Sequence, residues 1–284
     1  MKNFLWIISK DTRYFHDAIN ILDEQSDGLE IVGKAAGEDI AKVICKDVDV
    51  ILVVGAKKFG MSKITQAARQ LNLPEEKLLG DWIVCIPGFT LKKYRCLQRS
   101  RLSIFSMNCF GGAISHMLGL SFLSPFVNMF FEEQDYLRFL REPRSYIEEP
   151  IIFKGTAWEA DLKFDYPIVT LGDVTIHMNH YKTFEAAVAK WNERKARINW
   201  YNLFVTAYTE NEEFLEEFDA LPYGRKVCFV PFKSDLDSAW YINPNTIPDL
   251  EFWDIVNHFG FGNPFYYDPF DMLLYSKKTP LIEM

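Results

Sequence analysis

The sequence has 284 residues, enough for one large hydrophobic core or two smaller ones. Hydrophobic residues make up 49% and charged residues 25%, a composition that excludes a disordered or fibrous chain. The formal net charge is −8, and no basic stripe with interleaved aromatic residues occurs, so we expect no nucleic-acid partner.

No apolar run approaches the roughly 20 residues that a membrane-spanning helix needs, and the N-terminal run is too short for a signal peptide. The five cysteines lack Cys-x-x-Cys spacing, which argues against disulfides and structural zinc. His177 and His180 have the spacing of two metal ligands, but no third ligand is evident. We therefore predict a cytoplasmic protein without a transmembrane segment or a metal site.

Strands and helices alternate over the first 95 residues, which predicts a parallel sheet with crossover helices. The strands are expected at 3–9, 29–34, 50–55 and 82–86, and the helices at 14–23, 37–46 and 62–71. A dinucleotide site would need glycines after the first strand, but residues 9–13 contain none, and Gly55–Gly60 is a weak substitute. The sequence therefore favours a structural or docking domain here and specifies no cofactor.

The chain after the basic segment 92–101, which we interpret as a solvated linker, contains further strands and helices. Strands are expected at 102–107, 151–153, 174–178, 203–207 and 226–230, and helices at 113–118, from 132, at 183–198 and at 212–218. In the helix 183–198, Thr183 is the expected N-cap and Trp191 belongs to the apolar face. We predict an α/β protein of two Rossmann-like three-layer α/β/α units with mostly parallel or mixed sheets, a small domain at 1–97 and a larger one at 98–284.

Polar residues follow several strands of the larger domain, where open α/β sheets bind ligands. If these strands are parallel, a cysteine, histidines and a carboxylate converge on one edge. The candidate catalytic residues are Cys109, His180, His116 and Glu210. A helix N-terminus should lower the pKa of the Cys109 thiol, and His180 is a candidate general base. In the alternative interpretation Cys109 is a buried residue of a tight turn whose glycines serve backbone geometry, and His116 is a satisfied helix-face residue.

Several motifs in fixed order resemble a bacterial family of unknown function that is encoded among capsule and exopolysaccharide biosynthesis genes. They are residues 106–112, 116–120, 124–128, 176–181, 190–191 and 197–200, and the resemblance covers about residues 100–275. Relatives tend to place an acidic motif with Gly and Cys after the strand that corresponds to 203–207, whereas this chain has Thr209-Glu210-Asn211-Glu212 there. The resemblance implies a role in cell-surface glycan biosynthesis and no established catalytic residues.

The leading hypothesis is a transferase, acyl or glycosyl, that acts on an activated sugar such as a nucleotide sugar or on a glycan. Its candidate substrate-binding residues are Asn108, Gly111, Gly112, Asn128, His177, Tyr181, Arg197 and Asn199. Arg197 could bind an anionic group or could simply cap its helix. The alternative is a non-catalytic module that binds a glycan precursor or another protein of the same pathway. The sequence does not specify an oligomeric state.

Overall fold

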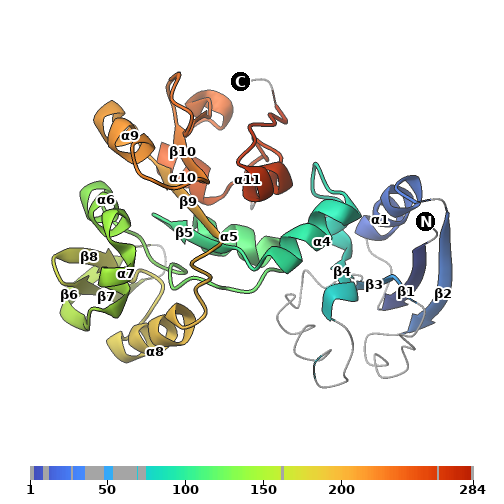
Figure 1. Ribbon diagram of the computed structural model, residues 1–284, viewed down its shortest axis with the longest axis horizontal. Coiled ribbons are helices and arrows are strands. Elements are labelled where there is room, and N and C mark those ends of the chain that lie inside the picture. The colour runs from blue at the N-terminus through green and yellow to red at the C-terminus, as the bar shows by residue number, and fades with distance from the viewer. Residues whose placement is uncertain are drawn as a thin grey trace. The chain divides into compact units, whose positions relative to one another are not determined.

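The computed structural model describes residues 3–8, 13–26, 28–35, 48–53, 69, 75–160, 163–260 and 262–282 (Figure 1). The chain divides into two units. The first comprises Met1–Arg99 and His116–Leu120, and the second comprises Ser100–Ser115 and Ser121–Met284. Each unit has its own parallel sheet, which confirms the predicted α/β class.

The first unit contains a four-stranded parallel sheet with the strand order β2-β1-β3-β4. Its strands are β1 (Asn3–Ile8), β2 (Leu29–Ala35), β3 (Val50–Val53) and β4 (Leu78–Gly80), with α1 (Arg13–Glu24) between the first two and a short 3-10 helix, η3 (Glu75–Lys77), before the last. The first three strands and α1 confirm the predicted elements. The glycine-free turn at 9–12, the predicted helix 37–46 and the segment 55–60 lie outside the described residues, as does the predicted helix 62–71 apart from residue 69.

Two predictions for the end of this unit are wrong. The expected strand at 82–86 is instead the helix α3 (Asp81–Val84), whose Trp82 indole nitrogen donates a hydrogen bond to the Met117 carbonyl at 2.8 Å. The expected solvated linker is the helix α4 (Leu91–Ser100), with Tyr94 and Leu97 buried. Its basic residues occupy the more exposed side of an amphipathic helix. Because these charged residues dominate the segment, it was interpreted from the sequence as a solvated linker.

The second unit contains a parallel sheet with the strand order β11-β10-β9-β5. Its strands are β5 (Ser103–Ser106), β9 (Leu203–Tyr208), β10 (Lys226–Val230) and β11 (Ala239–Tyr241), and every neighbouring pair is parallel. The helix α5 (Phe110–Met117) follows β5, and α9 (Glu212–Asp219) follows β9. The carboxyl ends of β5, β9 and β10 therefore lie along one edge of the sheet.

The second unit also contains a three-stranded antiparallel sheet, β6-β7-β8, formed by β6 (Ile151–Glu159), β7 (Phe164–Leu171) and β8 (Val174–His177) (Figure 1). The predicted strand at 174–178 thus exists as β8, but it belongs to the antiparallel sheet. The histidines were expected to join Cys109 only if all these strands were parallel, and that condition is not met. The strand β7 was not predicted. It contains Pro167, which cannot donate to the ladder, although its carbonyl accepts a hydrogen bond from the Met178 N–H at 3.0 Å.

The remaining helices are α6 (Glu133–Arg141), α7 (Pro143–Glu148), α8 (Phe184–Lys195), α10 (Phe252–Asn257), α11 (Pro269–Tyr275) and the 3-10 helix η4 (Pro244–Thr246). The predictions for α8 are confirmed: Thr183 accepts a hydrogen bond from the Ala186 N–H, and Trp191 is only 1% exposed. No helix in the described part of the chain is long and apolar enough to cross a membrane.

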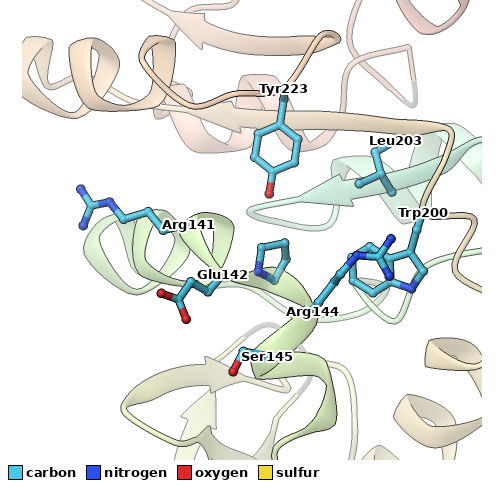
Figure 2. Close-up of a pocket in the computed structure, with 8 residues that line it drawn as sticks. Arg141, Glu142, Arg144, Ser145, Trp200, Leu203 and Tyr223 are labelled. Carbon is cyan, nitrogen blue, oxygen red and sulfur yellow. The ribbon is translucent and has the colours of Figure 1, made fainter.

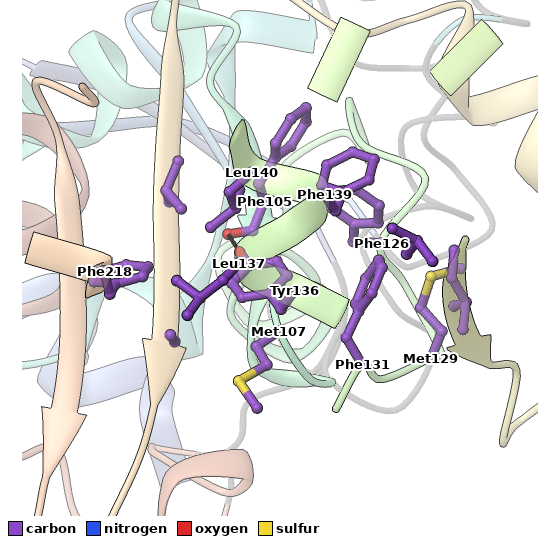
Figure 3. Packing of buried hydrophobic residues seen from close by; sticks show 14 of the residues in the cluster. Phe105, Met107, Phe126, Met129, Phe131, Tyr136, Leu137, Phe139, Leu140 and Phe218 are labelled. Carbon is purple, nitrogen blue, oxygen red and sulfur yellow. Dashed lines mark hydrogen bonds between the residues drawn. The ribbon is translucent and has the colours of Figure 1, made fainter. Parts of the chain in front are cut away.

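A pocket of about 380 Å³ lies at the amino end of β9, where Trp200 and Leu203 meet the turn between α6 and α7 (Figure 2). Trp200 also packs against the hydrophobic core of the second unit, part of which Figure 3 shows. There Phe105 packs edge-on against Phe126, and Tyr136 donates its hydroxyl proton to the Phe105 and Thr206 carbonyls at 2.9 and 3.1 Å. These contacts fix α6 to β5 and β9, and thereby hold the residues that precede α6.

Candidate functional site

One short segment, residues 129–132, connects the two sheets of the second unit at the carboxyl end of β5. On one side, the Phe131 N–H donates to the Met107 carbonyl at 2.9 Å. On the other side, Phe130 and His177 exchange two backbone hydrogen bonds of 2.9 Å, so Phe130 extends the antiparallel sheet beside β8. The loop that begins at Asn108 and the end of β8 therefore lie on opposite sides of the same short segment.

The loop between β5 and α5 is held by its own polar side chains. The Asn108 side-chain oxygen accepts hydrogen bonds from the Phe110 N–H at 3.1 Å and the Ser106 hydroxyl at 3.2 Å, and the Ser106 oxygen accepts one from the Gly111 N–H at 3.1 Å. Asn108 is only 5% exposed, and its Nδ2 has no hydrogen-bond partner among the described residues. A buried amide donor is thus left unsatisfied at the start of α5.

The two glycines of this loop are explained by close packing. A Cβ atom on Gly111 would lie 2.8 Å from the Ser106 Cβ, and one on Gly112 would lie 3.1 Å from the Val127 Cγ1. Neither glycine has a positive φ, so the backbone-geometry explanation that the sequence suggested is wrong. Small residues are needed here because α5 lies directly against β5 and the segment that contains Val127.

The thiol of Cys109 has the opposite pKa shift from the one predicted. Its side chain is half-buried, and Sγ donates a long hydrogen bond of 3.9 Å to the Met129 carbonyl. Burial raises the pKa of the Cys109 thiol to about 11, and the negative charge of Glu159 acts in the same direction. The loss of hydration outweighs any effect of the α5 N-terminus. At neutral pH the thiol is therefore protonated.

His177 lies in the best-defined polar arrangement of this edge. Its ring stacks on Phe130, with centroids 4.4 Å apart, and its Nδ1 lies 3.2 Å from the Tyr166 hydroxyl. Burial lowers the pKa of His177 from its ordinary value of 6.5, while the negative charge of Glu132 acts in the opposite direction. A neutral imidazole at neutral pH can accept a proton, as a general base must.

Carboxylates surround this edge. Burial, followed by the charges of Glu132, Glu133 and Glu210, raises the pKa of Tyr208 to about 12. The Thr209 hydroxyl, next in the chain, donates to Glu133. The carboxylates of this edge can accept hydrogen bonds from the hydroxyl groups of a sugar.

His180 and Tyr181 follow β8, and Tyr181 contacts Val127, the residue against which Gly112 packs. His180 is exposed, yet the protein atoms around its ring lower its pKa, and Glu159 raises it. Tyr181 is buried, donates to the Val127 carbonyl at 3.2 Å and accepts a hydrogen bond from Arg194 at 2.7 Å. Burial raises the pKa of Tyr181, and Arg194 lowers it. The Tyr181 hydroxyl is thus already occupied by protein groups.

Three of the sequence-predicted residues, His116, Arg197 and Asn199, do not join this edge, and Asn128, which precedes Met129 beside it, has an exposed side chain. His116 is exposed in the last turn of α5, at the other end of that helix from Cys109. Asn128 is exposed and has a φ of 67°, a left-handed conformation that asparagine tolerates well. Arg197 forms an exposed ion pair with Glu193.

Asn199 lies at the opposite, amino end of β5. Its backbone N–H donates to the Ser103 hydroxyl at 2.8 Å, and its side chain donates to the Arg101 carbonyl at 3.0 Å. Arg197 is two residues before it in the chain. A ligand at the carboxyl edge would therefore not meet Asn199.

The residues that sequence reasoning missed are Phe130, Glu132, Glu159, Tyr166 and Tyr208. Tyr208 directly follows a correctly predicted strand and could have been included on that ground. Glu132 was assigned only to a helix start, and Tyr166 lies on the strand that was not predicted. Among the described residues, no group of three or more His, Cys, Asp or Glu side chains could hold a metal ion.

Comparison with known proteins gives one relative and one family model. An uncharacterized protein of Haemophilus influenzae (strain Rd) is 34% identical to this chain over 182 residues, which cover 62% of this chain and 84% of the relative. Residues 84–277, which include every element described at the carboxyl edge, match a family described only as a domain of unknown function. The chain therefore belongs to the DUF1919 family.

Proposed function

We propose that the protein is a transferase of cell-surface glycan biosynthesis, which moves an acyl or glycosyl group from an activated donor to a sugar hydroxyl. The observation that carries the proposal is the meeting of the Asn108–Cys109 loop with His177 across the segment 129–132. The resemblance to capsule and exopolysaccharide proteins supplies the process.

In both acyl and glycosyl transfer the acceptor hydroxyl loses a proton and its oxygen bonds to the transferred group, while the bond to the donor breaks and releases coenzyme A or a nucleoside diphosphate. The shared step is the removal of the proton. His177 can perform it in the tautomer that donates from Nδ1 to the Tyr166 oxygen, because Nε2 then carries a free lone pair. The nearby Glu132 carboxylate would stabilise the imidazolium that forms. His177 thus takes the role that the sequence gave first to His180.

The other groups of the edge have complementary roles in this proposal. The unpartnered Asn108 amide can donate a hydrogen bond to an oxyanion that develops during transfer. The carboxylates of Glu132 and Glu210, with the Tyr208 ring, suit the hydroxyls and apolar face of a sugar. A thiol with a pKa of about 11 is a poor nucleophile, so Cys109 would attack only if a base first removed its proton.

The second candidate is a module that binds a glycan precursor without catalysis. It is favoured by the protonated state of Cys109 and by the packing role of Gly111 and Gly112, which together leave the loop without an activated nucleophile. The two candidates differ in whether product forms, and not in whether sugar binds.

The test measures transfer from acyl-coenzyme A and from nucleotide sugars to oligosaccharide acceptors by mass spectrometry. We expect His177→Asn, which keeps a polar group beside Tyr166, to lower kcat by about 10²–10⁴-fold. His116→Asn is the matched control and should leave activity unchanged, because His116 is exposed in the last turn of α5 and no hydrogen bond or ion pair joins it to His177 among the described residues. Activity should fall at acid pH with a midpoint below 6.5, and Glu132→Gln should lower that midpoint further by removing the charge that raises the pKa of His177.

Two outcomes contradict the transferase. An unchanged rate in His177→Asn would remove the proposed base. Saturable sugar binding without product from either donor class would identify the binding module.

A further inference from the structure

The pocket at the amino end of β9 is separate from the candidate site. Leu203, which lines the pocket, begins β9, whereas Tyr208 of the candidate site ends it. The volume of about 380 Å³ is at the small end of the range for ligand pockets. Nothing in the proposed transferase chemistry uses it.

The inner wall of the pocket is rigid and aromatic. Trp200 packs edge-on against the buried Phe105, with ring centroids 5.7 Å apart, so its indole is anchored to the core. The guanidinium of Arg144 lies 4.5 Å from the centre of the Trp200 ring, which is a cation–π contact. Trp200 therefore holds an exposed cation in a defined orientation at the pocket.

The two arginines of the pocket differ in how their donors are used. Arg141 forms an ion pair with Glu217, and Figure 2 shows its guanidinium pointing away from the pocket centre. Within the described part of the chain, Arg144 has neither a hydrogen bond nor an ion pair to a protein acceptor. Its planar set of N–H donors is suited to the bidentate binding of a carboxylate or a phosphate.

The remaining lining indicates a hydroxylated ligand. Ser145 contributes a hydroxyl and its side chain is exposed, whereas the Glu142 carboxylate points away from Arg144 and Trp200 (Figure 2). The Tyr223 hydroxyl already donates to the Leu140 carbonyl at 2.6 Å, so its oxygen remains available to accept a hydrogen bond. Hydroxyl oxygens of this kind bind sugar hydroxyls.

We propose that this pocket binds a small anionic sugar, either a sugar acid or a sugar phosphate, with the acidic group on Arg144. The inference does not rest on the proposed transferase activity. Trp200 is a positioning residue for Arg144, and the hydroxyls of Ser145 and Tyr223 favour a hydroxylated ligand over a simple anion.

The experiment is isothermal titration calorimetry of the full chain with four probes: glucuronate, glucose 1-phosphate, glucose and inorganic phosphate. We expect saturable binding of one or both anionic sugars, and at least tenfold weaker binding of glucose and inorganic phosphate. Arg144→Gln should weaken binding by about 10–100-fold, because a charge-assisted hydrogen bond is lost. Arg141→Gln, the matched control, should change the affinity less than threefold.

The comparison of glucuronate with glucose 1-phosphate shows whether the pocket prefers a carboxylate or a phosphate. Four results would overturn the proposal. These are no binding of either anionic sugar at millimolar concentration, equal binding of glucose, equal binding of inorganic phosphate, and equal losses in Arg144→Gln and Arg141→Gln. Because both side chains are exposed, we expect both variants to fold like the wild type, and their melting temperatures check this.

Discussion

At the scale of single residues, the surroundings of a side chain determine its chemistry here. Cys109 stands between a strand and a helix, a position that can lower the pKa of a thiol. In the folded chain its half-buried thiol contacts the Met129 carbonyl, and burial raises the pKa to about 11. Cys96, by contrast, lies on the exposed side of α4, and its side chain is exposed to solvent.

This difference predicts the order of alkylation by iodoacetamide on the native protein. At pH 7.5 Cys96 should label well before Cys109, because only a thiolate reacts and most Cys109 stays protonated. Between pH 7.5 and 9 the thiolate fraction of Cys109 should rise about tenfold per pH unit, since both values lie below its pKa. Mass-spectrometric mapping gives the order, with urea-unfolded protein as the reference for equal reactivity. Earlier labelling of Cys109 would show that the site lowers its pKa.

At the scale of elements, the candidate site depends on how closely α5 approaches β5. Gly111 lies in the first turn of α5, with Ser106 and Ile104 of β5 against it. An added Cβ would lie 2.8 Å from the Ser106 Cβ and 3.0 Å from the Ile104 Cγ2. Because these neighbours belong to a buried strand, they cannot give way without moving β5.

Gly111→Ala should therefore destabilise the protein, although alanine favours a helix by about 1 kcal/mol. Overpacking costs about 1–3 kcal/mol, so we expect a net loss of up to about 2 kcal/mol in the free energy of unfolding. Urea denaturation measures it. Gly224→Ala is the control, because nothing lies within 4 Å of a Cβ there and the stability should stay within about 0.5 kcal/mol. A Gly111→Ala protein at least as stable as the wild type would show that α5 can shift.

At the scale of the whole molecule, the division into units does not follow the chain order. His116–Leu120 belongs to the first unit, although the residues on both sides of it belong to the second. Within the first unit the Trp82 indole donates to the Met117 carbonyl at 2.8 Å, and the Tyr94 hydroxyl donates to the Leu118 carbonyl at 3.1 Å. Leu118 is fully buried.

A chain that starts at Ser100 should consequently be unstable. It would lose both hydrogen bonds and the residues that bury Met117 and Leu118, which contribute about 2 kcal/mol each when fully buried. We expect a lower melting temperature than that of the full chain and binding of the dye ANS to the exposed apolar surface. Trp82→Phe in the full chain is the comparison, because it removes one hydrogen bond and should cost about 1 kcal/mol. An unchanged melting temperature without dye binding would show that residues 100–284 fold alone.

The sequence by itself determined the elements whose signals are local. The strands at 3–8, 29–35 and 203–208 were predicted from short apolar runs, and α8 from its N-cap Thr183 and the apolar spacing of Trp191. The residues that follow β5 and β9 were found as well, because polar residues after a buried strand are visible in sequence. Such signals depend only on neighbours in the chain, so no tertiary information is needed to read them.

Only the tertiary structure decided which of these residues meet. The hairpin that brings Tyr166 to His177 has a local signal that was missed, because the two residues Gly172-Asp173 join β7 to β8. The pairing of Phe130 with His177 joins segments that are distant in the chain, and it has no local signature. The same long-range pairing of β5 with β9 places Asn199 at the opposite end of the sheet from Cys109. The protonation of Cys109 follows from burial by residues remote in sequence, because desolvation is a property of the packed interior and not of the chain.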